Sequence, residues 1–96
     1  MEIVLHVVSA NMSKLKEALH KDDFVSRASI MFREGSLIGK KDYFCLISGT
    51  EEQCKKALEI SKDLAKEADK KDAHEFISKI REEEQKAAEG LGGIFG

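Results

Sequence analysis

The sequence RASIMFREGSLIGKKDYFCLIS, residues 27–48, decides the fold because it holds two runs of strand-forming residues around a turn. Both runs, residues 27–33 and residues 41–48, are rich in β-branched and aromatic side chains, which favour strands. Between them, the tripeptide Glu34-Gly35-Ser36 predicts a hairpin turn, and Gly39 predicts a β-bulge. The stretch therefore predicts two antiparallel strands joined by a short connection.

An apolar run and a short amphipathic segment precede this hairpin. Residues 3–8 read IVLHVV, so a strand is predicted over residues 1–9. Apolar side chains then recur at helical spacing, which predicts a helix over residues 11–20. Up to residue 48, the predicted order of elements is therefore strand, helix, strand, strand.

A capping motif opens the helical part of the chain. The tetrapeptide Thr50-Glu51-Glu52-Gln53 matches a capping box, in which the first hydroxyl accepts from the fourth amide and the fourth side chain reaches back to the first amide. Apolar side chains then repeat every three or four residues, which predicts a helix over residues 51–70. The apolar register shifts between Asp69 and Asp72, so a further helix is predicted over residues 72–88. The apolar face of this further helix is formed by Ala73, Phe76, Ile77 and Ile80.

The chain ends in a glycine-rich segment. Residues 90–96 contain four glycines, so we assign residues 1–89 to a single domain and residues 90–96 to a tail. Leu91, Ile94 and Phe95 are unusual in a solvated terminus. The tail is therefore predicted to be either mobile or docked on the domain or on a partner.

The element order predicts a topology. The helical crossover places the first two strands parallel, and the hairpin places the third antiparallel to the second. Strands one and three are apolar on both faces and strand two carries Arg27 and Arg33, so the expected sheet is mixed and three-stranded, in the order 1-3-2. This α+β order, βαββα with a C-terminal helical extension, resembles the ferredoxin-like superfold without its fourth strand. The resemblance implies that the helices cover one face of the sheet.

The second face of the predicted sheet is also apolar, and it therefore needs a cover. One face is expected to carry Ile3, Leu5, Val7, Ile30, Phe32, Phe44 and Leu46. The other is expected to carry Val4, His6, Val8, Met31, Tyr43, Cys45 and Ile47. Either the last helix folds back over this second face, or a second subunit covers it. We expect a homo-oligomer, most simply a two-fold dimer.

Composition restricts the functional class. The 96 residues carry a net charge of −2 and 42% hydrophobic side chains, values typical of a folded domain and unfavourable for a nucleic-acid binder. The longest apolar run is too short to span a bilayer, so no membrane association is predicted. With two cysteines and no export signal, the chain is predicted to be cytoplasmic with reduced thiols.

Candidate site residues lie on the second face and at the hairpin. His6 and Cys45 are predicted to be neighbours there, beside Met31 and Tyr43, but a metal would need a third ligand, so neither a metal nor another cofactor is predicted. The amides at residues 9–13 offer an alternative anion site at a helix start. Lys40 and Lys41 supply positive charge for such an anion or, with Arg27 and Arg33, for a nucleic acid.

These patterns favour a binding function. We expect a non-enzymatic, small oligomeric domain that binds a small molecule or a protein partner at a subunit interface. The alternative is a nucleic-acid-associated protein that uses the basic hairpin residues. A small enzyme with a site shared between subunits stays open as a third class, although no nucleophile with an adjacent base is identifiable.

Overall fold

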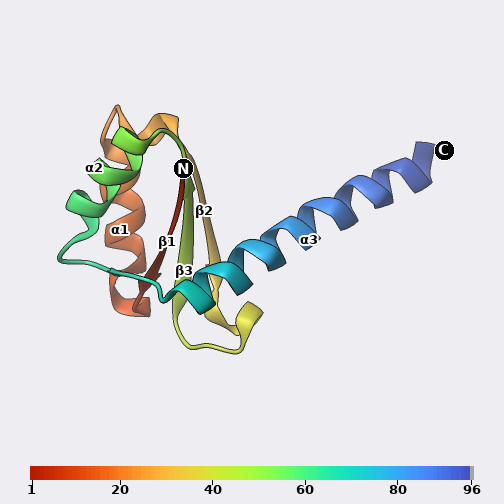
Figure 1. Ribbon diagram of the computed structural model, residues 1–96, viewed down its shortest axis with the longest axis horizontal. Helices are drawn as coiled ribbons and strands as arrows, with labels where there is room; N and C mark the ends of the chain where they lie inside the picture. The colour runs from red at the N-terminus through yellow and green to blue at the C-terminus, as the bar shows by residue number, and fades with distance from the viewer. Residues whose placement is uncertain (96) are drawn as a thin grey trace.

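The computed structural model describes the backbone of residues 1–95 and the side chains of residues 1–87. Within this range the chain forms an α+β fold, in which one sheet lies between helices (Figure 1). The elements are, in chain order, β1 (Glu2–Val7), α1 (Ser9–Lys21), the 3₁₀ turn η1 (Val25–Arg27), β2 (Ser29–Glu34), the 3₁₀ turn η2 (Gly35–Ile38), β3 (Tyr43–Ser48), α2 (Glu51–Ser61), β4 (Lys66–Glu67) and α3 (Lys70–Phe95).

The sheet has four strands in the order β2-β3-β1-β4, and each neighbouring pair is antiparallel. The predicted order 1-3-2 is present among the first three strands, with β2 at an edge, but the predicted three-stranded, mixed sheet is corrected to four strands with antiparallel neighbours. β3 separates the parallel strands β1 and β2, so no parallel pair is formed, and β4 adds to the free edge of β1 opposite Leu5 and His6. A pattern of apolar residues could not reveal β4, because both of its residues, Lys66 and Glu67, are charged and exposed.

The first core lies between the sheet and the helix pair α1 and α2. Helix α1 contributes Leu15 and Leu19, and α2 contributes Cys54 and Ala57, all fully buried. The strand residues of this core are Ile3, Leu5, Val7, Cys45 and Ile47. Because these positions alternate along β1 and β3, their side chains share one face of the sheet, and that face is buried.

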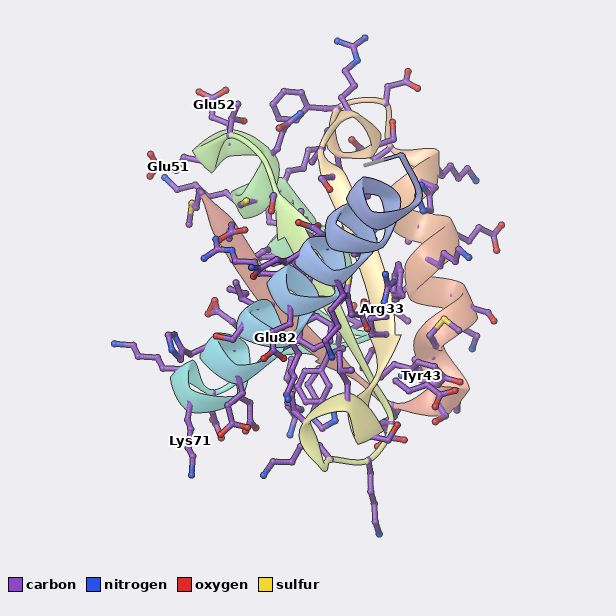
Figure 2. The ribbon with its side chains drawn as sticks, turned by 90° about the vertical axis from the view of Figure 1, so that its right-hand side faces the viewer. Arg33, Tyr43, Glu51, Glu52, Lys71 and Glu82 are labelled. Carbon is purple, nitrogen blue, oxygen red and sulfur yellow. The ribbon has the colours of Figure 1, made fainter. Side chains whose placement is uncertain are left out.

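The first turns of helix α3 pack on the opposite face of the sheet, and the rest of the helix extends away from it (Figure 1). Phe76 and Ile80 of α3 pack against Val4, Phe44 and Leu46, and all five side chains are buried. Figure 2, which looks at the molecule from the α3 side, shows this helix crossing in front of the strands. The first two helices cover one face of the sheet, and of the two covers predicted for the second face, the last helix or a second subunit, the structure has the last helix, α3.

The helical boundaries differ from those predicted. A helix over residues 51–70 was expected. Helix α2 instead ends at Ser61, because the chain turns after Ser61. The amides of Leu64 and Ala65 both donate to the Ser61 carbonyl, at 2.9 and 2.8 Å. Leu64 and Ala65 lie in this turn, yet they still pack against the first core. Their spacing in the sequence therefore resembles that of a continuing helix. A break before the next helix is present, but it begins at Lys62.

Helix α3 is longer than the predicted helix over residues 72–88. It runs from Lys70 to Phe95, so the backbone of residues 90–95 continues the helix. Gly96 and the side chains from Ala88 onward lie outside the described residues. Whether the apolar tail docks on the domain or on a partner therefore stays a prediction.

The hairpin connection is longer than the predicted tripeptide turn. It runs through η2 to Asp42, and Gly39 ends η2 in a left-handed conformation with φ of 69°, so the predicted bulge at Gly39 is wrong. Gly35 is needed for close approach, because a Cβ there would lie 2.5 Å from the Lys41 carbonyl oxygen. This folded-back connection brings Lys41 close to the end of β1.

Candidate functional site

His6 lies near the end of β1, where three strands meet. It is paired with Phe44 of β3 and with Lys66 of β4. Its imidazole stacks on the Phe44 ring, with centroids 4.6 Å apart and planes within 4°. The Nε2 atom lies 3.3 Å from the Lys41 carbonyl oxygen, to which a ring protonated at Nε2 donates. One ring face and one nitrogen of this half-buried histidine are therefore fixed by the protein.

Cys45 is not a neighbour of His6, and the predicted pairing of these two residues on one face is corrected. Cys45 is opposite Leu5 in the register and belongs to the core beneath α1 and α2, whereas His6 stacks on the α3 side. A difference of one residue in strand register reverses the face of every side chain, which explains the error. Burial raises the pKa of the Cys45 thiol to about 12, so the thiol stays protonated at neutral pH.

Tyr43 and Met31 are likewise placed on opposite faces. Tyr43 packs against the first core, and Met31 packs against the second core beneath α3. Met31 therefore shares a face with His6, while Tyr43 shares a face with Cys45. The four residues that were predicted to form one surface do not come together.

The hairpin lysines are exposed, but the predicted basic patch is divided by carboxylates. The Lys40 ammonium lies 3.8 Å from Asp72 of α3, and Arg33 is bonded to Glu83 at 3.1 Å. Lys41 contributes its main-chain carbonyl to His6. The positive charge of this region is therefore compensated in part within the fold.

The start of α1 is occupied by a carboxylate of the chain itself. Asp42 Oδ1 accepts from the Ser9 amide at 3.1 Å and from the Ser9 hydroxyl at 3.0 Å. The hydrogen bond from the Ser9 amide is the largest cause that lowers the pKa of Asp42, followed by that from the hydroxyl. The predicted anion position at the first amide of this helix is therefore taken by Asp42.

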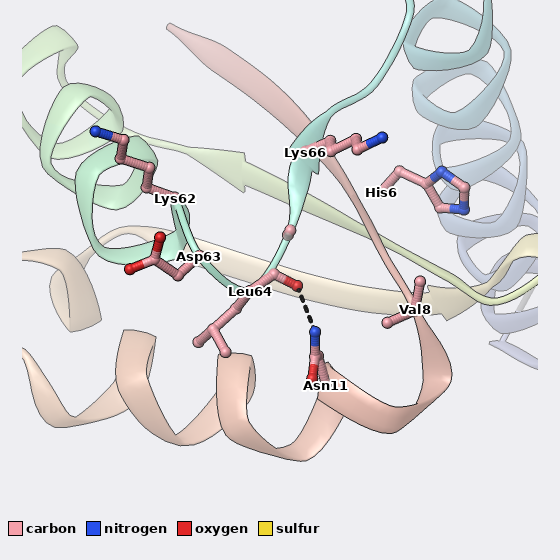
Figure 3. A pocket seen from close by; sticks show the side chains of 8 residues that line it. His6, Val8, Asn11, Lys62, Asp63, Leu64 and Lys66 are labelled. Atoms are coloured by element: carbon pink, nitrogen blue, oxygen red, sulfur yellow. Dashed lines mark hydrogen bonds between the residues drawn. The ribbon is translucent and has the colours of Figure 1, made fainter.

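A pocket opens beside His6, between the end of β1, the start of α1 and the turn before β4 (Figure 3). Its volume is about 310 Å³. The lining residues are His6, Val8, Asn11, Lys62, Asp63, Leu64, Ala65 and Lys66. The Asn11 side-chain amide donates to the Leu64 carbonyl at 3.3 Å and so fixes the turn against α1.

The pocket combines apolar and positively charged groups. Val8 is an apolar side chain that is 48% exposed. Lys66 extends toward the His6 side of the pocket, whereas Lys62 extends away from it (Figure 3). An ammonium beside an imidazole suits the carboxylate or phosphate of a small molecule, and Val8 suits an apolar part of the same molecule.

Of the pocket residues, the sequence singled out His6 and, within residues 9–13, the segment that holds Asn11, but it did not single out Lys66. A helix over residues 51–70 would have placed Lys66 on a solvated helix surface, far from the end of β1. The turn after Ser61 and the pairing of Lys66 with His6 bring Lys66 to the end of β1. No local signal for this pairing exists in a two-residue charged strand.

Residues 1–87 contain no group of three His, Cys, Asp or Glu side chains arranged to hold a metal ion. Among the helices within residues 1–95, none combines the length and apolar character needed to cross a bilayer.

When the chain is compared with known proteins, no family model, curated protein or solved structure matches it.

Proposed function

We propose that this protein is a small, non-enzymatic binding domain, which assembles as a homo-oligomer and takes up a small molecule in the pocket beside His6. The observation that carries this proposal is the meeting of His6, Lys66 and the exposed Val8 around one open cavity. The chemical class that fits these groups is a small carboxylate or phosphate compound with an apolar part. A protein side chain of the same character is the second kind of ligand.

The arrangement of the elements supports a ferredoxin-like topology. Read from the β4 edge, the strand order is 4-1-3-2, and the element order through β4 is βαββαβ. In this scheme α3 is an addition that covers the face left open by α1 and α2. The topology supports no particular function, because many unrelated functions use the same fold.

The state of the two cysteines supports a binding role. Cys45 and Cys54 are both buried and unpaired, and the thiol of Cys45 is held protonated. A protonated, enclosed thiol is a poor nucleophile and a poor metal ligand. Two reduced thiols also support a cytoplasmic location.

An oligomer is supported by the free edge of the sheet, because β2 pairs on one side only, with β3. Val8, 48% exposed at the mouth of the cavity, lies toward the opposite side of the sheet and is available to a ligand. Nothing favours the nucleic-acid alternative: Arg33 and Lys40 face carboxylates, and Phe44 is fully buried. A platform of exposed aromatic rings for base stacking is not formed by these residues.

A nuclear magnetic resonance titration tests the proposed site. Succinate and inorganic phosphate are added separately to the full chain, and the amide signals are followed. We expect saturable shifts at His6, Val8 and Lys66, and a binding constant about tenfold weaker in Lys66→Gln, because a charge-assisted hydrogen bond is lost.

Lys14→Gln is the matched control, since Lys14 is an exposed lysine of α1 that does not line the pocket. It should bind like the unmodified chain. Shifts that are spread over the whole surface, or that are equal in the two variants, would contradict the assignment of this pocket.

A further inference from the structure

The outer edge of β2 has no neighbouring strand among the described residues. β2 is six residues long and pairs only with β3, whereas the opposite edge of the sheet is formed by the two charged residues of β4. A long edge strand with apolar side chains is a template for pairing with another strand. β2 carries Ile30, Met31 and Phe32 at its centre, all half-buried, and contains no proline; its charged residues, Arg33 and Glu34, are confined to its C-terminal end.

The hydrogen-bond pattern shows which main-chain groups face outward. The Gly35 amide donates to the Asp42 carbonyl at 2.7 Å, in the same register as the pairs of β2 with β3. Hydrogen-bonded pairs alternate along an antiparallel ladder, so odd-numbered residues of β2 bond to β3. The main-chain groups of the even-numbered residues Ile30, Phe32 and Glu34 therefore point away from the sheet.

Most of these outward groups have no main-chain partner among the described residues. The Phe32 carbonyl accepts one bond, from Arg33 Nη1 at 2.8 Å, and the same guanidinium holds Glu83 through Nε. A carbonyl oxygen has two lone pairs, so Phe32 can accept a second bond from a neighbouring strand. The edge is therefore competent to add a strand.

We infer that this edge binds β2 of a second copy, antiparallel and about a two-fold axis through Met31. This deepens the proposed homo-oligomer by naming its interface. The register follows from the outward groups, because only even-numbered residues can form the hydrogen-bonded pairs across the axis. Ile30 is then opposite Phe32 of the second copy, Met31 is opposite itself, and Ser29 is opposite Arg33.

The side chains select this register over its neighbours. An aromatic residue opposite a β-branched one is a favourable cross-strand pair, and here it occurs twice by symmetry. Shifting the axis to Ile30 would place Arg27 opposite Arg33, and shifting it to Phe32 would place Ile30 opposite Glu34. The central apolar triplet is thus complementary to itself, which favours a second copy over an unrelated peptide.

The position of Ser29 provides a test of the partner and the register. Ser29 is exposed, so it can carry a charge without loss of core packing. Ser29→Glu should tighten the dimer about 2- to 30-fold, because two symmetric carboxylates meet Arg33 of the other copy. Ser29→Lys should weaken it by a similar factor.

The two variants are controls for each other. Since the chain has a net charge of −2, general repulsion between copies would make Ser29→Lys associate more tightly and Ser29→Glu less tightly, the reverse of our expectation. Sedimentation equilibrium over a concentration series gives the dissociation constants. Amide exchange at Ile30 and Phe32 should slow as the dimer forms.

The outcomes separate this inference from the proposed function. A dimer whose affinity ignores the charge at Ser29, and whose Ile30 and Phe32 amides exchange as fast as in the monomer, overturns the β2 interface but leaves the oligomer standing. A chain that stays monomeric overturns both the interface and the oligomer. The pocket beside His6 is tested independently, by its own titration.

Discussion

Asp42 connects the start of β3 with the start of α1 through its hydrogen bonds to Ser9. The pKa of its carboxyl is lowered from the ordinary 3.8, chiefly by the bond from the Ser9 amide. A carboxyl whose folded-state pKa is lowered stabilises the fold at pH above its unfolded value. That stabilisation is lost as the pH falls through the lower, folded value.

We therefore predict that Asp42→Asn makes the stability of the fold less sensitive to acid. Asparagine keeps an acceptor oxygen and tolerates the left-handed conformation of this residue, whose φ is 65°, but it does not ionise. The free energy of unfolding should fall less steeply in the variant than in the unmodified chain as the pH is lowered below about 4. Denaturant unfolding at several pH values measures both slopes, and parallel curves would count against this role.

At the residue scale, local interactions could be predicted from the sequence and long-range ones could not. The capping box is confirmed: Gln53 N donates to Thr50 Oγ1 at 3.1 Å, and Thr50 N donates to Gln53 Oε1 at 2.9 Å. All of its atoms lie within four consecutive residues. The partners of His6 depend on strand register and on a loop 35 residues away in sequence, which no local pattern encodes.

At the scale of elements, α3 is the part that closes the second face of the sheet. Phe76 is fully buried and packs against Phe44, with ring centroids 5.5 Å apart. Phe44 in turn stacks on His6. The packing of α3 therefore supports the ring that holds one side of the candidate site.

Removing the Phe76 ring should destabilise the fold strongly. We predict that Phe76→Ala lowers the free energy of unfolding by about 3–5 kcal/mol, because burial is lost and a cavity remains. Lys79→Ala, on an exposed position of the same helix, should change it by less than about 0.5 kcal/mol. Denaturant unfolding compares the two, and a small effect of Phe76→Ala would mean that α3 does not cover this face in solution.

The elements also show where a periodic pattern misleads. Leu64 and Ala65 continue the helical spacing of α2, yet they lie in a turn. The spacing misleads because apolar side chains can pack against the first core from a turn as well as from a helix. The shift of apolar register after this turn correctly predicts a separate helix. It does not predict which face of the sheet that helix covers, because the pattern identifies the apolar side of the helix but not the direction in which the helix runs.

At the scale of the whole molecule, the sequence patterns were sufficient for the α+β class and for the need to cover two apolar faces. The strand and helix periods establish the class, because they depend on alternation within each segment. The fourth strand and the pocket depend on residues 62–67, which are mostly charged and whose two apolar residues continue the spacing of the preceding helix. Of the predicted binding residues, His6 alone therefore lines the pocket.

The central claim is that this domain works as a homo-oligomer with a ligand pocket at its surface. Its most direct test is the molar mass of the unmodified full chain in solution, measured by sedimentation equilibrium up to millimolar concentration. The account predicts a reversible rise from the mass of one chain to the mass of two. A mass that stays at one chain over the whole range would contradict it.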